Sequence, residues 1–347
     1  MSYDLLKSSG TRAYASLSWR MFISSVLLWV GLMVVMAFPV HAQTAASEAD
    51  LISLLNRLQS SARELDYSGI YVHNHNGRIV SSRIVHVVDG TGERERLEIL
   101  DGPPREYVQH NSQVQCLMPE SKTIKLEQER TDRFPGLLLA DASRIAQSYE
   151  AFMNVASQRV AGRDCQVTDL KARDNRRYDY RICTDEKTNL LLKFEAIAPG
   201  NKIVEQIVFT SVDIGKGVPH ALLAPSWDTK GWRVVEAVME PVDIAGQGWR
   251  IPAPPGFEPA MQVKRTMVDS RHVDQLVLTD GLAAISVFIE PARPNSGDAF
   301  ESSRHEAGAV NMHRTRIGDY WVTVLGEVPA STLRDLIERT EFVPLAR

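Results

Sequence analysis

The feature that most constrains this chain is a long succession of short β-type runs with few helical patterns between them. From residue 66 to 128, apolar residues recur with a period of two, and clusters of Gly, Pro, Asn or Ser separate the runs. The same pattern resumes from residue 154 to 214. Strands that follow one another without intervening helices pair as an antiparallel meander. A sheet with this many strands twists and curls on itself, so the sequence predicts a curled antiparallel sheet.

Two helical patterns interrupt the predicted strands. From residue 47 to 65 the leucines recur at helical spacing, and Ser47 is placed to cap that helix. The second pattern follows an apolar stretch at residues 134–139. Asp141 is placed to cap it, and this helix is predicted to carry Ile145, Tyr149, Phe152 and Met153. We expect both helices to cover the sheet and to enclose an apolar interior.

In the second half of the chain, residues 272–290 form two apolar runs around Asp280–Gly281. An Asp-Gly pair favours a type I′ hairpin turn, because both central residues of that turn need a positive φ. The predicted partners across a two-residue turn are Thr279 with Leu282, Leu276 with Ile285, and Val273 with Phe288. Ile285, Val287 and Ile289 then share one face. We expect a core hairpin without a site of its own.

The N-terminus has the pattern of an export signal. Basic residues precede an apolar run from Met21 to Phe38, and Val40–His41–Ala42 follows as a small-residue cleavage site. The sequence therefore predicts a signal peptide over residues 1–42, cleaved between Ala42 and Gln43. The apolar run is long for a signal peptide, so an uncleaved membrane anchor is the alternative.

Composition limits the partners and the redox state of the chain. The net charge is −4, which argues against nucleic acid as a partner. Export places the three cysteines in an oxidising compartment. A turn at Asp174–Asn175 puts Cys183 opposite residue 165 or 166, so a Cys165–Cys183 disulfide is plausible. The alternative is two small buried side chains, and Cys116 is left over in either case.

The sequence contains no motif of a nucleophilic hydrolase, a nucleotide-binding loop or a zinc protease. His73 and His75 lie two residues apart on a predicted strand and therefore share a face, and His86 falls on the partner strand. Such histidines are far more often solvent-facing than metal-binding. We therefore expect no enzyme, no cofactor and no metal.

Several motifs together resemble the RseB/MucB family, the periplasmic negative regulators of an envelope-stress sigma factor. The matching stretches are Tyr67–Gly69, Val160–Arg163, Arg177–Arg181, Thr188–Phe194, Trp249–Pro252, Pro254–Phe257 and Tyr320–Pro329. Each stretch is weak by itself, and those of the second domain are the most specific.

The resemblance implies an α+β fold in two domains. Residues 47–214 are expected to form a curled antiparallel half-barrel with helices, similar to the lipoprotein carriers LolA and LolB, with an apolar concave face. Residues 215–232, rich in Gly and Pro, are expected to be a linker. Residues 233–347 are expected to form a smaller C-terminal α+β domain.

The resemblance also implies a function. A periplasmic protein of this family would bind the periplasmic domain of a transmembrane anti-sigma factor of the RseA/MucA type and protect it from regulated proteolysis. Acyl chains of lipopolysaccharide or lipoprotein would then release that partner as a stress signal. The alternative is a periplasmic lipoprotein or lipid carrier of the LolA kind, and a homo-oligomer remains open.

Two sets of residues are candidate binding surfaces. The candidates for the lipid cavity are Leu137, Leu138, Leu139, Ile145, Phe152 and Met153. The candidates for partner binding are Trp249, Phe257 and Phe288. The arginines from Arg173 to Arg177 are expected to be the solvated tip of a hairpin, and anion binding near an apolar opening is the alternative.

Overall fold

The structure is a computed structural model. It describes residues 45–75, 77–127, 134–137, 141–215, 217–236, 239–266, 271–292, 305–307 and 309–344. The predicted signal peptide, residues 1–42, lies outside the described residues. In the described part, no helix is both long and apolar enough to cross a membrane.

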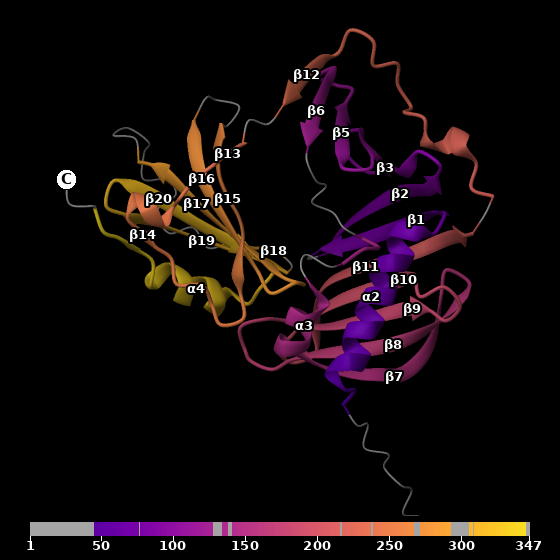
Figure 1. Ribbon diagram of the computed structural model, residues 1–347, viewed down its shortest axis with the longest axis horizontal. Helices are drawn as coiled ribbons and strands as arrows, with labels where there is room; N and C mark the ends of the chain where they lie inside the picture. Colours follow the sequence, from indigo (N-terminus) through magenta and orange to yellow (C-terminus); the bar gives the residue numbers. More distant parts are fainter. Residues whose placement is uncertain are drawn as a thin grey trace, which may run out of the picture. The chain divides into compact units, whose positions relative to one another are not determined.

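The N-terminal part of the chain forms one large sheet (Figure 1). Its strands follow the order β12-β6-β5-β4-β3-β2-β1-β11-β10-β9-β8-β7, and all neighbours are antiparallel except β12 and β6. Two meanders, β1–β6 and β7–β11, therefore meet where β1 pairs with β11. The strands are β1 (Tyr67–His75), β2 (Arg78–Asp89), β3 (Gly92–Ile99), β4 (Arg105–His110), β5 (Gln113–Met118), β6 (Thr123–Glu127), β7 (Tyr149–Val160), β8 (Arg163–Ala172), β9 (Asp179–Asp185), β10 (Leu191–Ala198), β11 (Lys202–Ile214) and β12 (Arg233–Glu236).

Helices α2 (Glu48–Glu64) and α3 (Ala142–Ser148) cover this sheet, and α2 lies across it in Figure 1. Both caps agree with the prediction. The Ser47 side chain accepts a hydrogen bond from the amide of Asp50, and that of Asp141 accepts one from the amide of Ser143. The buried leucines of α2 join one apolar core with residues from both meanders.

The end of α3 differs from the prediction. The helix stops at Ser148, and Tyr149, Phe152 and Met153 lie in strand β7 instead. Pairing with β8 explains the difference, because Tyr149 lies opposite Ala172 and Phe152 lies opposite Asp169, so the start of β7 gains cross-strand neighbours. The local helical pattern is overridden by this long-range pairing.

The C-terminal part forms a seven-stranded sheet of order β13-β15-β16-β17-β20-β19-β18. Helix α4 (Ala330–Glu338) buries Leu333, Leu336 and Ile337, the core face that the sequence predicts. The strands are β13 (Met239–Pro241), β15 (Glu258–Thr266), β16 (His272–Thr279), β17 (Ala284–Pro291), β18 (His305–Ala307), β19 (Val310–Ile317) and β20 (Tyr320–Gly326), with a separate pair, β14 (Trp249–Arg250) and β21 (Glu341–Phe342). Two short 3-10 helices are η1 (His220–Leu223) and η2 (Ala245–Gln247). The described part of the chain is thus mainly β with few helices.

The hairpin of β16 and β17 exists, but its predicted register is wrong. Thr279 pairs with Ala284 and Leu276 with Val287, so the loop comprises residues 280–283 instead of two residues. Each strand partner is displaced by two positions. Because side chains alternate along a strand, Ile285, Val287 and Ile289 still share the buried face.

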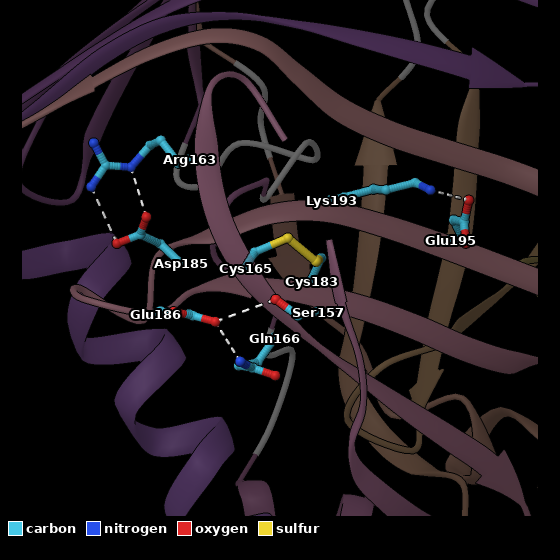
Figure 2. The surroundings of a disulfide bond; sticks show 9 residues. All are labelled: Ser157, Arg163, Cys165, Gln166, Cys183, Asp185, Glu186, Lys193 and Glu195. Atoms are coloured by element: carbon cyan, nitrogen blue, oxygen red, sulfur yellow. Dashed lines mark hydrogen bonds and ion pairs between the residues drawn. A yellow bond between two sulfur atoms is a disulfide. The ribbon is translucent and has the colours of Figure 1, made fainter. Parts of the chain in front are cut away.

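The predicted Cys165–Cys183 disulfide is present and joins β8 to β9 (Figure 2). Cys183 lies opposite Val167 and not opposite residue 165 or 166, because the connection spans residues 173–178 rather than a tight turn. Close to the disulfide, Arg163 contacts Asp185 through Nε to Oδ1 at 2.7 Å. Burial raises the pKa of Asp185, but hydrogen bonds from Arg163 and Thr188 outweigh burial and leave that pKa below its ordinary value.

Candidate binding site

Three of the predicted lipid-cavity residues lie in or against the helix-covered core of the large sheet. Ile145 of α3 is fully buried in this core, and Leu137 and Met153 pack against it while partly exposed. Phe152 is half-buried on β7. Leu138 and Leu139 lie outside the described residues. A cavity for acyl chains at these positions stays a prediction.

An aromatic cluster fills the centre of the same core. The rings of Tyr71, Phe134 and Phe209 are all buried, and Phe134 stands 5.0 Å from each of the other two rings between centroids. Tyr71 and Phe209 come from β1 and β11, where the two meanders meet. Sequence analysis did not single out this cluster, although the period-two pattern places Tyr71 on the core face.

An open groove of about 680 Å³ follows the outer side of α2. Its lining is mixed, with Ile52 and Leu65 among polar side chains such as Asn56, Arg57 and Asn189. None of the four described lipid-cavity candidates lines this groove. The groove and the predicted cavity are therefore separate places on the first domain.

A buried ion pair connects the two sheets. The guanidinium of Arg177, which precedes β9, donates from Nε to Oδ2 of Asp280 at 2.8 Å and from Nη2 to the carbonyl of Pro255 at 2.8 Å. It also lies over the ring of Phe257, 5.0 Å from the centroid. Arg177 is 5% exposed, so its prediction as part of a solvated hairpin tip is wrong.

Asp280 is the centre of this junction, and its side chain is fully buried. Besides the Arg177 contact, its Oδ2 accepts a hydrogen bond from the hydroxyl of Tyr149 at 3.0 Å. Burial raises the pKa of Tyr149 well above its ordinary value, and the neighbouring Tyr180 and Asp280 raise it further. The phenol therefore stays protonated and remains a donor to Asp280.

Further contacts complete the junction. Asn311 Nδ2 donates to the hydroxyl of Tyr178 at 2.9 Å, and Thr332 Oγ1 donates to the carbonyl of Arg176 at 2.9 Å. Arg144 of α3 forms an ion pair with Glu258 of β15. The sequence gives no sign of these contacts, because each joins residues more than a hundred positions apart.

The three predicted partner-binding residues lie in different environments. Trp249 and Phe257 are buried in the core of the second domain, where Trp249 packs against the rings of Tyr320 and Phe342. Phe288 lies on the opposite face of β17 from Ile289 and is half-buried. In this conformation only Phe288 offers surface to a partner, and the role of all three stays a prediction.

One group of the described residues has side chains placed to hold a metal ion: His73 and His75 of β1 with Glu205 of β11. His86 lies apart from it. That side chain pairs in register with Tyr67, is fully buried, and its Nδ1 is 2.7 Å from the carbonyl oxygen of Leu65.

Both halves of the chain match one family. A profile of the MucB/RseB N-terminal domain matches residues 50–227, and one of the MucB/RseB C-terminal domain matches residues 243–341. This chain belongs to the MucB/RseB family. The resemblance noted in the sequence is thereby confirmed.

Relatives within the family match over nearly their whole length. The sigma factor AlgU regulatory protein MucB of Pseudomonas aeruginosa is 31% identical over 89% of this chain and 94% of its own. The sigma-E factor regulatory protein RseB of Salmonella typhimurium is 26% identical over 91% of this chain and 98% of its own. These homologues are regulatory proteins and not enzymes.

Solved structures agree with the sequence matches. The crystal structure of MucB in complex with MucA(peri) superposes with a TM-score of 0.67 and 29% identity, covering 86% of this chain and all of that one. The complex of Pseudomonas aeruginosa MucA and MucB gives a TM-score of 0.68. The fold of this chain is thus the fold of MucB.

Proposed function

We propose that this chain is a periplasmic regulatory protein that binds the periplasmic domain of a transmembrane anti-sigma factor. The observation that carries the proposal is the likeness to MucB in complex with MucA(peri), which extends over all of that chain at a TM-score of 0.67. Bound protein shields the anti-sigma factor from regulated proteolysis and keeps the sigma factor sequestered.

Lipid-type stress signals release the partner. A ligand changes the affinity for a partner only if it binds the two conformational states differently. In the proposed mechanism the first domain is a half-barrel of the LolA kind. An acyl chain enters its helix-covered core near Ile145 and favours the state in which the partner is not bound.

Helix α3 is the element proposed to carry this signal. Ile145 of α3 reaches the core of the first domain, while the adjacent Arg144 pairs with Glu258 of the second domain. Tyr149, directly after the helix, donates a hydrogen bond from its hydroxyl to Asp280 at the junction. Displacement of α3 by an acyl chain therefore strains the contacts between the domains.

The proposed location is the periplasm, reached through a signal peptide over residues 1–42. Two features support it. The Cys165–Cys183 disulfide fits an oxidising compartment. The match to the MucB/RseB profiles begins at residue 50, after the predicted cleavage site.

The experiment is a pull-down of residues 43–347 with the periplasmic segment of the host's anti-sigma factor, with proteolysis of that segment followed in parallel. We expect binding, slower cleavage, and reversal of both by lipopolysaccharide. Phe288→Ala should weaken binding, while the matched control Ile79→Ala, an exposed apolar residue on β2 of the large sheet, should not. Absence of binding at micromolar concentration, with extraction of lipid from membranes, would replace the proposal with a lipid carrier.

A further inference from the structure

We propose that His73, His75 and Glu205 form a binding site for a divalent transition-metal ion, with Zn²⁺ as the preferred ion. The three donor atoms lie within 4.8 Å of one another. Two imidazoles and one carboxylate are a common ligand set for zinc, and three protein ligands leave a position for water. This site is independent of the anti-sigma partner and of the lipid signal.

The strand register brings the three side chains together. His75 of β1 lies directly opposite Glu205 of β11, and His73 is two residues away on β1 and so points to the same face. Glu205 Oε1 stands 2.7 Å from His73 Nε2 and 3.9 Å from His75 Nδ1. Zinc bonds of about 2.0–2.2 Å in a tetrahedral arrangement separate their donors by roughly 3.3 Å, a value between these two distances.

The burial of the cluster suits an ion that enters from solvent. The side chains of His73 and His75 are 34% and 26% exposed, whereas that of Glu205 is 9% exposed. The imidazoles are therefore reachable, and the carboxylate lies beneath them with little water around it. An ionised carboxylate in such a place is stabilised by a cation, and a metal ion supplies more charge than a hydrogen bond does.

The simpler interpretation is a hydrogen-bonded His–Glu pair without metal. In that case a proton on His73 Nε2 is shared with Glu205 Oε1 and is retained. In the metal site the ion takes the place of that proton, so binding releases it to solvent and weakens as the pH falls. Register places Arg78 opposite His75 on β2, and the positive charge of this exposed side chain opposes binding.

The place of the site in the sheet gives it a structural consequence. His73 and Glu205 are 132 residues apart in sequence, and β1 and β11 are where the two meanders of the large sheet join. An ion held by both strands ties the two halves of the sheet together. Because the ion binds the folded chain, it raises the unfolding temperature with increasing free metal.

The test is a titration of residues 43–347 with Zn²⁺, followed by calorimetry and by a competing chelator dye. The compact unit of the structure, Thr44–Arg347, is contained in this chain. We expect one equivalent bound with micromolar affinity or tighter, with release of protons. Removing a residue that only hydrogen-bonds to a metal ligand lowers the metal affinity by about 10- to 100-fold. Removing a ligand itself should cost more, so we expect His73→Ala, His75→Ala and Glu205→Gln each to weaken Zn²⁺ binding by at least about 100-fold.

Control variants separate this site from other metal ligands. His110→Ala removes an exposed histidine of β4, and Cys116→Ser removes the free thiol, so both should bind Zn²⁺ like the parent chain. Thermal unfolding in a chelator checks that every variant folds. With added Zn²⁺, the unfolding temperature of the parent chain and of the controls should rise by several degrees, and that of the three site variants should not. Weak binding in the parent chain, or equal binding in parent and site variants, overturns the proposal.

Discussion

Two turns in this chain carry nearly the same sequence signal and have different structures. Asn76–Gly77 and Asp280–Gly281 each stand between β-type runs. At the first, His75 pairs directly with Arg78, as a two-residue turn requires. At the second, Thr279 pairs with Ala284, and the loop is longer. Gly77 is exposed with open space around it, whereas Asp280 is fully buried.

The longer loop at the buried turn follows from what the Asp280 side chain binds. Oδ1 of Asp280 accepts the amides of Leu282 and Ala283 within its own loop, at 3.0 and 2.8 Å. Its Oδ2 accepts from Arg177 and Tyr149 of the first domain. Local turn chemistry thus decides the exposed turn, while at the buried turn the loop conformation is fitted to partners that are distant in sequence.

The largest expected effect is loss of the Asp280 carboxylate. Asp280→Asn removes the buried counter-charge of Arg177, which keeps its ion pair with the partly exposed Asp174 at 2.7 Å. Breaking one side of a buried ion pair costs about 3–5 kcal/mol, and the remaining Asp174 contact favours the lower end of that range. We expect a loss of this size in the free energy of unfolding of residues 43–347, measured by urea denaturation.

The matched control is Asp319→Asn in the Gly318–Asp319 turn, where the aspartate side chain is 98% exposed. This change should alter the free energy of unfolding by less than about 0.5 kcal/mol. If Asp280→Asn costs no more than Asp319→Asn, the buried ion pair does not stabilise the junction, and the contrast between the two turns loses its energetic basis.

Removal of the disulfide is expected to have the next largest effect. Cys165 and Cys183 are separated by 18 positions, and a loop of that size is worth about 3 kcal/mol in the chain-entropy model. Because β9 follows directly after the segment that carries Arg177, loss of this link also loosens the chain beside the junction. Cys165→Ser with Cys183→Ser should lower the urea midpoint, and added reductant should lower that of the parent chain equally. A parent chain insensitive to reductant would contradict this.

Alkaline pH is expected to destabilise the buried turn through Tyr149, by a smaller amount than the two preceding changes. The pKa of Tyr149 is raised in the folded chain, so above about pH 10 the unfolded chain loses this proton while the folded chain keeps it. The protonated phenol therefore contributes fully to the free energy of unfolding below about pH 10. As the pH rises from 10 to 11, this free energy falls by about 1 kcal/mol for one tyrosine. Unfolding of Tyr149→Phe followed from pH 8 to 11 should show a shallower decline. Equal slopes for both chains would show that this phenol ionises alike in the folded and unfolded states.

The sequence predicts features that depend on near neighbours. The caps at Ser47 and Asp141, the core face of α4 and the two cysteines that bond are all set by local pattern or by strands close in sequence. Features that depend on distant partners are missed. The end of α3, the loop at Asp280 and the burial of Arg177 follow from pairing between segments far apart.

The metal cluster shows the same limit. A pair of histidines two residues apart indicates a shared face, and that much was visible in His73 and His75. The third ligand was not, because Glu205 becomes their neighbour only through the pairing of β1 with β11. His86 does lie on the partner strand β2, as the sequence indicates, but opposite Tyr67 and away from the cluster.

At the exposed turn itself, substitutions are expected to act through backbone strain alone. Gly77 has a φ of +80° and no atom within 4 Å of an added Cβ, so Gly77→Ala meets only backbone strain and should cost about 1–2 kcal/mol. Asparagine tolerates a positive φ better than alanine does, so Gly77→Asn should cost less. Gly318, with a φ of +59° in another open turn, is the matched position and should respond in the same way. Urea denaturation of the four variants measures this. A loss at Gly77 well above that at Gly318 would mean that the first turn, like the second, supports contacts beyond its own backbone, and the neighbouring His73–Glu205 contact would be the first to examine.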